Sequence, residues 1–307
     1  MQKYSQSMKL MGNNFTITVV ADNEATGSRN IDLAVAEIKR IESLFTTYKN
    51  DSQTNLINDN AGIAPIKVDT EVYDLIERSI AISKITQGAF DISYGSIDKR
   101  LWNFDKSMKA LPDAEKALKM VYLIDYRNIL LDAQRQTVFL KEKGMRIGFG
   151  GIGKGYAAEM AKHILKNNNV KSGIINASGD LTAWGNQPNG KQWTIGIADP
   201  DNPNALFSYM EISEKAVATS GNYEKYVVIG GKKYSHTIDP KTGLPITGIK
   251  SVTIISDNAE FADAMATPIA IMGINAGLFL INQIPELYCI IIDDNNKIYT
   301  SNNINLR

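Results

Sequence analysis

Residues 251–271 read S-V-T-I-I-S-D-N-A-E-F-A-D-A-M-A-T-P-I-A-I, and this stretch carries the strongest structural signal in the chain. Its first part, 251–256, is rich in β-branched residues and predicts a strand. Asp257 and Glu260, three residues apart, resemble a capping box and predict the start of a helix. The positions that follow are almost all apolar, so we expect this helix to be buried in the fold.

Asp263 and Thr267 are the polar exceptions on this apolar helix. Residues four apart share a helix face, so a carboxylate and a hydroxyl point the same way. Two hard oxygens suit Mg²⁺, and a cation would satisfy two polar groups that are otherwise costly to bury. Pro268 is expected to kink the helix and to loosen the Ala264 carbonyl. Spacing alone also fits a solvated face or a capping interaction.

One of the two histidines, His236, lies in the turn-rich segment Y-S-H-T-I-D-P-K-T-G (234–243). A neutral imidazole near an anionic substrate is a plausible general base, and Asp239 would orient it. A structural histidine bonded to a backbone carbonyl is the competing interpretation. The other histidine, His163, belongs to an ordinary amphipathic helix and is interpreted as structural.

The most glycine-dense segment, G-F-G-G-I-G-K-G (148–155), opens onto a predicted helix. Glycines let backbone N–H groups approach an anion at a helix N-terminus, and Lys154 adds a full positive charge. The spacing matches neither a P-loop nor a dinucleotide fingerprint, so a simple tight turn stays an alternative.

Outside these motifs, hydrophobic periodicity predicts a mixture of strands and helices. Helices are predicted at 31–48, from 70 onward and at 156–166, with a loop over 50–62. Strands are predicted at 15–20, 129–131, 138–140, 173–177, 193–198, 209–212, 216–221 and 226–231. Runs of hairpins with several helices indicate an α+β fold with mixed, largely antiparallel sheets and packed helices.

Composition excludes some classes of protein. Lys+Arg and Asp+Glu both number 33 among 307 residues, so there is no basic excess for nucleic acid as a main partner. The single cysteine, Cys289, excludes an internal disulfide and is expected in the core. No apolar run approaches the ~20 residues of a membrane span, and the first residues lack the apolar middle of a signal peptide.

Together, these segments resemble the ApbE family of FAD:protein FMN transferases, from Met11 to about Gly273. The matching blocks are M-G-N-N-F (11–15), I-E-S-L-F-T-T-Y (41–48), G-A-F-D-I-S (88–93), G-G-I-G-K-G-Y-A (150–157), N-A-S-G-D (176–180), A-T-S-G-N-Y (218–223), H-T-I-D-P-K-T-G-L-P (236–245) and A-D-A-M-A-T (262–267). So many blocks in one order make the resemblance specific.

The resemblance implies a T-fold-like architecture, with residues 1–307 as one domain or two lobes around an FAD cleft. It implies Mg²⁺-dependent transfer of FMN from FAD to a Ser or Thr hydroxyl of an acceptor flavoprotein, with release of AMP. His236 matches the family's proton acceptor. The metal ligands implied are Asp263, Thr267 and the main-chain carbonyl of Gly153. The FAD contacts implied are Met11, Tyr48, Ala89, Phe90, Asp91, Lys154 and Thr237.

Two positions depart from the family pattern: Gly153 replaces a usual alanine and Ser178 a usual glycine. A carbonyl ligand survives the first change. An FAD pyrophosphatase that gives FMN and AMP, and a noncatalytic FAD-binding protein, remain alternatives. By resemblance, we expect a monomer or weak dimer, and an acceptor such as a subunit of a membrane electron-transfer complex. Extracytoplasmic, lipoprotein-like placement is expected, and the absence of a signal leaves a cytoplasmic location open.

Overall fold

The computed structural model describes residues 1–98, 100, 102, 108–199, 202–221, 226–302 and 304. Its centre is an eight-stranded sheet in which every neighbouring pair is antiparallel. Across the sheet the strands are β1 (Gln2–Leu10), β2 (Asn13–Ala21), β6 (Gly173–Ala177), β7 (Asp180–Trp184), β10 (Lys215–Gly221), β13 (Ile249–Ser256), β14 (Tyr288–Asp293) and β15 (Ile298–Thr300).

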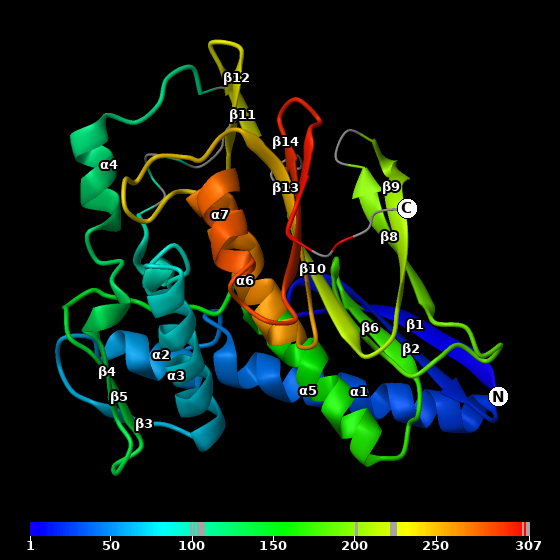
Figure 1. Ribbon diagram of the computed structural model, residues 1–307. Coiled ribbons are helices and arrows are strands. Elements are labelled where there is room, and N and C mark those ends of the chain that lie inside the picture. The colour runs from blue at the N-terminus through cyan, green and yellow to red at the C-terminus, as the bar shows by residue number, and fades with distance from the viewer. Residues whose placement is uncertain are drawn as a thin grey trace.

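Three helices pack against this sheet and against one another: α1 (Glu24–Phe45), α5 (Gly153–Asn167) and α6 (Ala259–Met272). Figure 1 shows α6 rising from α5 beside β10 and β13 toward α7, and α5 packs in turn against α1. Most of α6 is buried because α5 and the sheet both cover it. This packing places the middle of α6 next to the N-terminus of α5.

The other elements surround this core (Figure 1). The remaining helices are α2 (Gln53–Asp59), α3 (Thr70–Ile85), α4 (Ala114–Val121) and α7 (Ile274–Ile281), with 3-10 turns η1 (Ile92–Ser96) and η2 (Tyr126–Asn128). A small sheet is formed by β3 (Ile66–Lys67), β5 (Thr137–Leu140) and β4 (Ile129–Asp132). Two hairpins are formed by β8 (Trp193–Asp199) with β9 (Asn202–Ile212), and by β11 (Tyr226–Ile229) with β12 (Lys232–Ser235). Among the helices in the described ranges, none is long and apolar enough to cross a membrane.

The predicted α+β class is confirmed, as are the strand and the buried helix of residues 251–271. Cys289 is fully buried in β14, as expected. The predicted capping box is wrong. Asn258 caps α6 by accepting from the Phe261 N–H, while Asp257 pairs with Lys215 on the surface.

The loop predicted over 50–62 is also wrong, because residues 53–59 form α2. Ser52 caps this helix through its side chain, which accepts from the Asn55 N–H. Asn58 is buried and bonds both backbone groups of Ile147, with its amide donating at 3.0 Å and its carbonyl accepting at 2.7 Å. Polar residues here satisfy distant backbone groups, so the segment lacks the apolar period of an ordinary helix.

Candidate active site

One cleft brings together four of the residues singled out in the sequence. Its volume is about 250 Å³. Lys154 at the start of α5, His236 after β12, and Asp263 and Thr267 on α6 all line it. The other lining residues are Gly150, Gly151, Asp180, Thr219, Ser220, Gly221 and Ala266. The cleft therefore joins the glycine-rich segment, the histidine turn and the polar face of α6.

Asp263 is held in this cleft by an unusually close approach of α5 to α6. The Gly155 N–H donates to Asp263 Oδ2 at 2.9 Å. A Cβ on Gly155 would lie 2.1 Å from the Ala259 carbonyl oxygen and 2.7 Å from the Asp263 Cβ, so no side chain fits there. At the N-terminus of α6, the buried Glu159 accepts from the Ala259 N–H at 3.0 Å. The Gly155 N–H and the Glu159 carboxylate of α5 thus fix the position and the rotation of α6.

Lys154 bridges two buried carboxylates. Its Nζ donates to Asp180 Oδ2 in a very short contact and lies 3.4 Å from Asp263 Oδ1. Burial alone would lower the pKa of Lys154, but the charges of Asp263 and Asp180 outweigh burial and raise it, so the amine is charged. Burial and the neighbouring Asp263 raise the pKa of Asp180, and the charge of Lys154 opposes this rise.

The sequence had marked Asp180 only as the last residue of the block N-A-S-G-D, without a role. Thr219 and Ser220 stood likewise unassigned in the block 218–223. On β10, Ser220 Oγ accepts from Thr267 Oγ1 at 3.4 Å, which places both hydroxyls at the cleft wall. Asp180, Thr219 and Ser220 lie beside the predicted site residues because β7, β10 and α6 are adjacent in space.

His236 is half-buried in a bend that two aromatic residues hold in place. The Trp102 indole N–H donates to the Ser235 carbonyl at 3.0 Å, just before the histidine. Just after it, the Ile238 N–H donates to Tyr94 Oη at 3.2 Å. Burial raises the pKa of Tyr94 to about 12, so the phenol stays neutral.

The rest of the same turn is organised by its own backbone. Thr237 is buried, and its N–H donates to Ser235 Oγ at 2.9 Å. Asp239 Oδ1 accepts from the Lys241 N–H at 2.8 Å, and this contact shapes the turn. Orientation of His236 by Asp239 stays a prediction.

The surroundings of Asp263 fit a hard divalent cation. The charged Lys154 amine already occupies a position between two carboxylates, so the fold is built to hold positive charge there. Among the described residues, no group of three or more His, Cys, Asp or Glu is placed to hold a metal. Asp263 could hold a cation together with a hydroxyl, a main-chain carbonyl and substrate oxygens, which are ligands that Mg²⁺ prefers.

Gly153, the predicted carbonyl ligand, is buried at the first position of α5, next to Lys154. A Cβ there would meet only Phe149 and Met11, at 3.5 and 3.6 Å, which are ordinary contacts. Met11, predicted to contact FAD, thus lies against the start of α5. The structure has room for the alanine that the family usually carries at position 153.

Ser178, the other departure, sits in the left-handed region with φ of 53°. A glycine would adopt this conformation without strain. Ser178 Oγ instead exchanges hydrogen bonds with Asn14, accepting from its N–H and donating to its carbonyl, both at 3.1 Å. These bonds offset the conformational cost of the serine.

The remaining predicted FAD contacts lie outside the cleft lining. Phe90 and Ala89 are buried, and a Cβ on Gly151 would lie 3.7 Å from the Phe90 ring, so Phe90 supports the glycine-rich segment. Asp91 is buried and accepts from the Ser93 N–H, the Ser93 hydroxyl and the Tyr126 N–H. Burial raises the pKa of Asp91 to about 6. Tyr48 is 96% exposed and stands away from the core.

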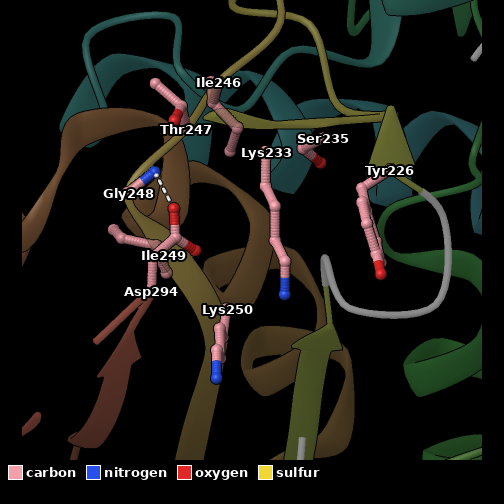
Figure 2. A pocket seen from close by; sticks show the side chains of 9 residues that line it. All are labelled: Tyr226, Lys233, Ser235, Ile246, Thr247, Gly248, Ile249, Lys250 and Asp294. Atoms are coloured by element: carbon pink, nitrogen blue, oxygen red, sulfur yellow. Dashed lines mark hydrogen bonds between the residues drawn. The ribbon is translucent and has the colours of Figure 1, made fainter. Parts of the chain in front are cut away.

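A second, much smaller cavity lies between the β11–β12 hairpin and the start of β13 (Figure 2). Its volume is about 20 Å³, room for roughly one water molecule. Thr247 Oγ1 is buried at its wall and makes no hydrogen bond with the described part of the chain. The Gly248 N–H donates to Asp294 Oδ2 at 3.0 Å, and Figure 2 shows this hydrogen bond between two of the lining residues. The cavity is too small for a nucleotide.

Known proteins are similar to this chain in sequence and in fold. The ApbE family model matches residues 11–291. A Klebsiella pneumoniae protein named FAD:protein FMN transferase is 32% identical over 99% of this chain and 93% of its own length. A Treponema pallidum protein of the same name is 27% identical over 98% of this chain and 87% of its own.

Solved structures of ApbE proteins have the same fold as this chain. The ApbE protein of Thermotoga maritima superimposes with a TM-score of 0.87 at 30% identity, covering 98% of this chain and 97% of that one. The Vibrio cholerae flavin transferase ApbE has the same fold, with a TM-score of 0.85 at 22% identity over 98% and 97% of the two chains. The family match spans every block that forms the cleft. The chain is a member of the ApbE family.

Proposed function

We propose that this chain transfers the FMN part of FAD to a Ser or Thr hydroxyl of an acceptor flavoprotein and releases AMP. The observation that carries the proposal is the cleft in which Lys154, His236, Asp263 and Thr267 meet. The named relatives, at 32% and 27% identity over nearly the whole chain, support the same reaction. We further propose a subunit of a membrane electron-transfer complex as the acceptor.

The reaction breaks one bond of the pyrophosphate and forms one phosphoester. The acceptor hydroxyl oxygen attacks the phosphorus of the FMN half, and the bridging oxygen leaves with AMP. His236 takes the hydroxyl proton, since it is the only histidine among the cleft-lining residues. Phosphoryl transfer depends mainly on positioning and charge neutralisation, so the charged Lys154 and the glycine-rich backbone would hold the pyrophosphate.

Mg²⁺ would be held by Asp263, Thr267 and the Gly153 carbonyl. When bound, Mg²⁺ neutralises charge on the pyrophosphate oxygens. Two observations support this metal site. Asp263 and Thr267 of α6 both line the cleft, and Asp263 already contacts a positive charge, the Lys154 amine.

Replacing the proposed base tests the assignment. His236→Ala should lose FMN transfer by roughly 10²–10⁴-fold, the usual contribution of general acid–base catalysis, while FAD binding persists. His163→Ala is the matched control, because the only other histidine in the sequence has a side chain that is 57% exposed and is not among the cleft-lining residues. The assay follows flavin fluorescence on the acceptor after denaturing electrophoresis. Unchanged transfer by His236→Ala would remove this residue from the reaction.

A further inference from the structure

Lys154 occupies a position that is built for a cation. Its amine contacts carboxylates from two different elements, Asp180 of β7 and Asp263 of α6. The two carboxylate side chains are only 6% and 7% exposed, against 24% for the lysine. One ammonium therefore neutralises two carboxylates that would otherwise face each other away from water.

The two contacts of this amine are unequal. The contact to Asp180 is the closer one, while Asp263 Oδ1 lies at 3.4 Å. Asp180 is also fixed from behind, since its other oxygen accepts from the Thr219 N–H at 3.3 Å. Asp263 has its second oxygen bound to the Gly155 N–H, and Oδ1 is the oxygen that contacts the lysine.

A divalent cation on Asp263 must compete with this amine. Like charges a few ångströms apart repel strongly in a partly buried site, because water screens them poorly there. The lysine cannot keep its contact with Asp263 Oδ1 once a dication binds to that oxygen. Its closer bond to Asp180 needs no change, and Lys154 lines the cleft, so the amine remains at the wall.

We propose that Lys154 is a built-in placeholder cation that a divalent metal displaces from Asp263, and that Asp180 is the positioning residue that retains it. Before the metal binds, the lysine keeps the two carboxylates together and the α5–α6 contact intact. After the metal binds, the amine is free on one side to meet an anionic phosphate. The identity of that phosphate as FAD rests on the proposed function, whereas the exchange itself requires only the metal.

A double-mutant cycle on metal affinity tests the exchange without FAD or acceptor, so it can succeed or fail independently of the transferase assay. Mn²⁺ binding is measured by calorimetry for the full chain, Lys154→Met, Asp180→Asn and the double variant. Circular dichroism checks that each variant is folded. Lys154→Gln replaces Lys154→Met if the methionine variant does not fold. Lys166→Met is the matched control, because this lysine is on the same helix but pairs with Glu214 on the surface.

Lys154→Met should bind Mn²⁺ about tenfold more tightly, since the competing amine is gone. Asp180→Asn should bind about tenfold more weakly, because the lysine then rests on Asp263 alone. In the Lys154→Met background the same Asp180→Asn change should cost only about twofold, from the loss of a nearby negative charge. Lys166→Met should bind as the unaltered chain does.

Additive effects in this cycle would overturn the proposal, because they would mean that Asp180 acts without the lysine. Failure of Lys154→Met to bind Mn²⁺ any better than the unaltered chain would overturn it too. A crystal structure with Mn²⁺ gives the direct readout. The Lys154 amine should lie more than ~4 Å from Asp263 Oδ1, which is beyond ion-pair distance. It should still contact Asp180. Metal on Asp263 with the amine unmoved would refute the exchange.

Discussion

Gly155→Ala tests whether the closeness of α5 and α6 builds the site. In most helices this change stabilises, by about 0.5–1 kcal/mol, because alanine has less freedom to lose on folding. Here the new Cβ would lie 2.1 Å from the Ala259 carbonyl oxygen and 2.7 Å from the Asp263 Cβ. Both atoms belong to the packed helix α6, and neither can rotate away as the end of a flexible side chain would.

The expected result is a net loss of stability. Overpacking of a buried contact costs about 1–3 kcal/mol, and a clash with backbone lies at the upper end of that range. After the helical gain is subtracted, we expect Gly155→Ala to lower the free energy of unfolding by about 2 kcal/mol. Urea denaturation followed by circular dichroism measures this value.

Gly153→Ala is the matched control, two residues earlier on the same helix. Its Cβ would meet its nearest neighbours at 3.5 and 3.6 Å, so we expect it to be neutral or stabilising by up to ~1 kcal/mol. Equal stability of the two variants would refute the reasoning, because only one of them pushes α6 away from α5.

Two further predictions concern the supports of the cleft. Burial raises the pKa of Asp91 to about 6 from 3.8 in the unfolded chain, so the folded state binds more protons between these values. The contribution of Asp91 to the free energy of unfolding, about 2–3 kcal/mol, is therefore present below pH ~4 and is lost as the pH rises through ~6. Asp91→Asn should remove this pH-dependent loss when urea unfolding is compared across the same pH window. Trp102→Phe deletes the indole donor to the Ser235 carbonyl and should cost about 1–3 kcal/mol of stability, because a buried acceptor loses its partner. Transfer should slow in this variant, since the turn that carries His236 is loosened. An unchanged rate would separate Trp102 from the positioning of His236.

Sequence reasoning succeeded where one element carried the whole pattern. The strand and helix of 251–271 follow from β-branched residues and from an apolar run, both of which are local signals. It missed β1, because Tyr4 and Met8 are only half-buried against the core and Gln6, on the same face, is exposed, so the alternating pattern is interrupted. The predicted capping box failed because the choice of cap fell between two adjacent residues, Asp257 and Asn258.

The site was predictable in its types of residue and less so in its geometry. Asp263, Thr267, Lys154 and His236 were named from motifs, and all four line one cleft. The role of Asp180 depends on β7 lying beside the N-terminus of α5, and no spacing within its own segment indicates that contact. Contacts between distant segments are set by tertiary packing, which a single sequence does not display.

The central claim is tested most directly by the mass of an acceptor after reaction. A flavin-free candidate acceptor flavoprotein with an accessible Ser or Thr is incubated with this chain, FAD and Mg²⁺, and AMP is quantified in the same sample. The account predicts one FMN bound as a phosphoester for each AMP released, and neither product with His236→Ala. Equal amounts of AMP and free FMN with an unmodified acceptor would identify a pyrophosphatase instead. Bound FAD with no AMP would identify a carrier, and either result would contradict the account.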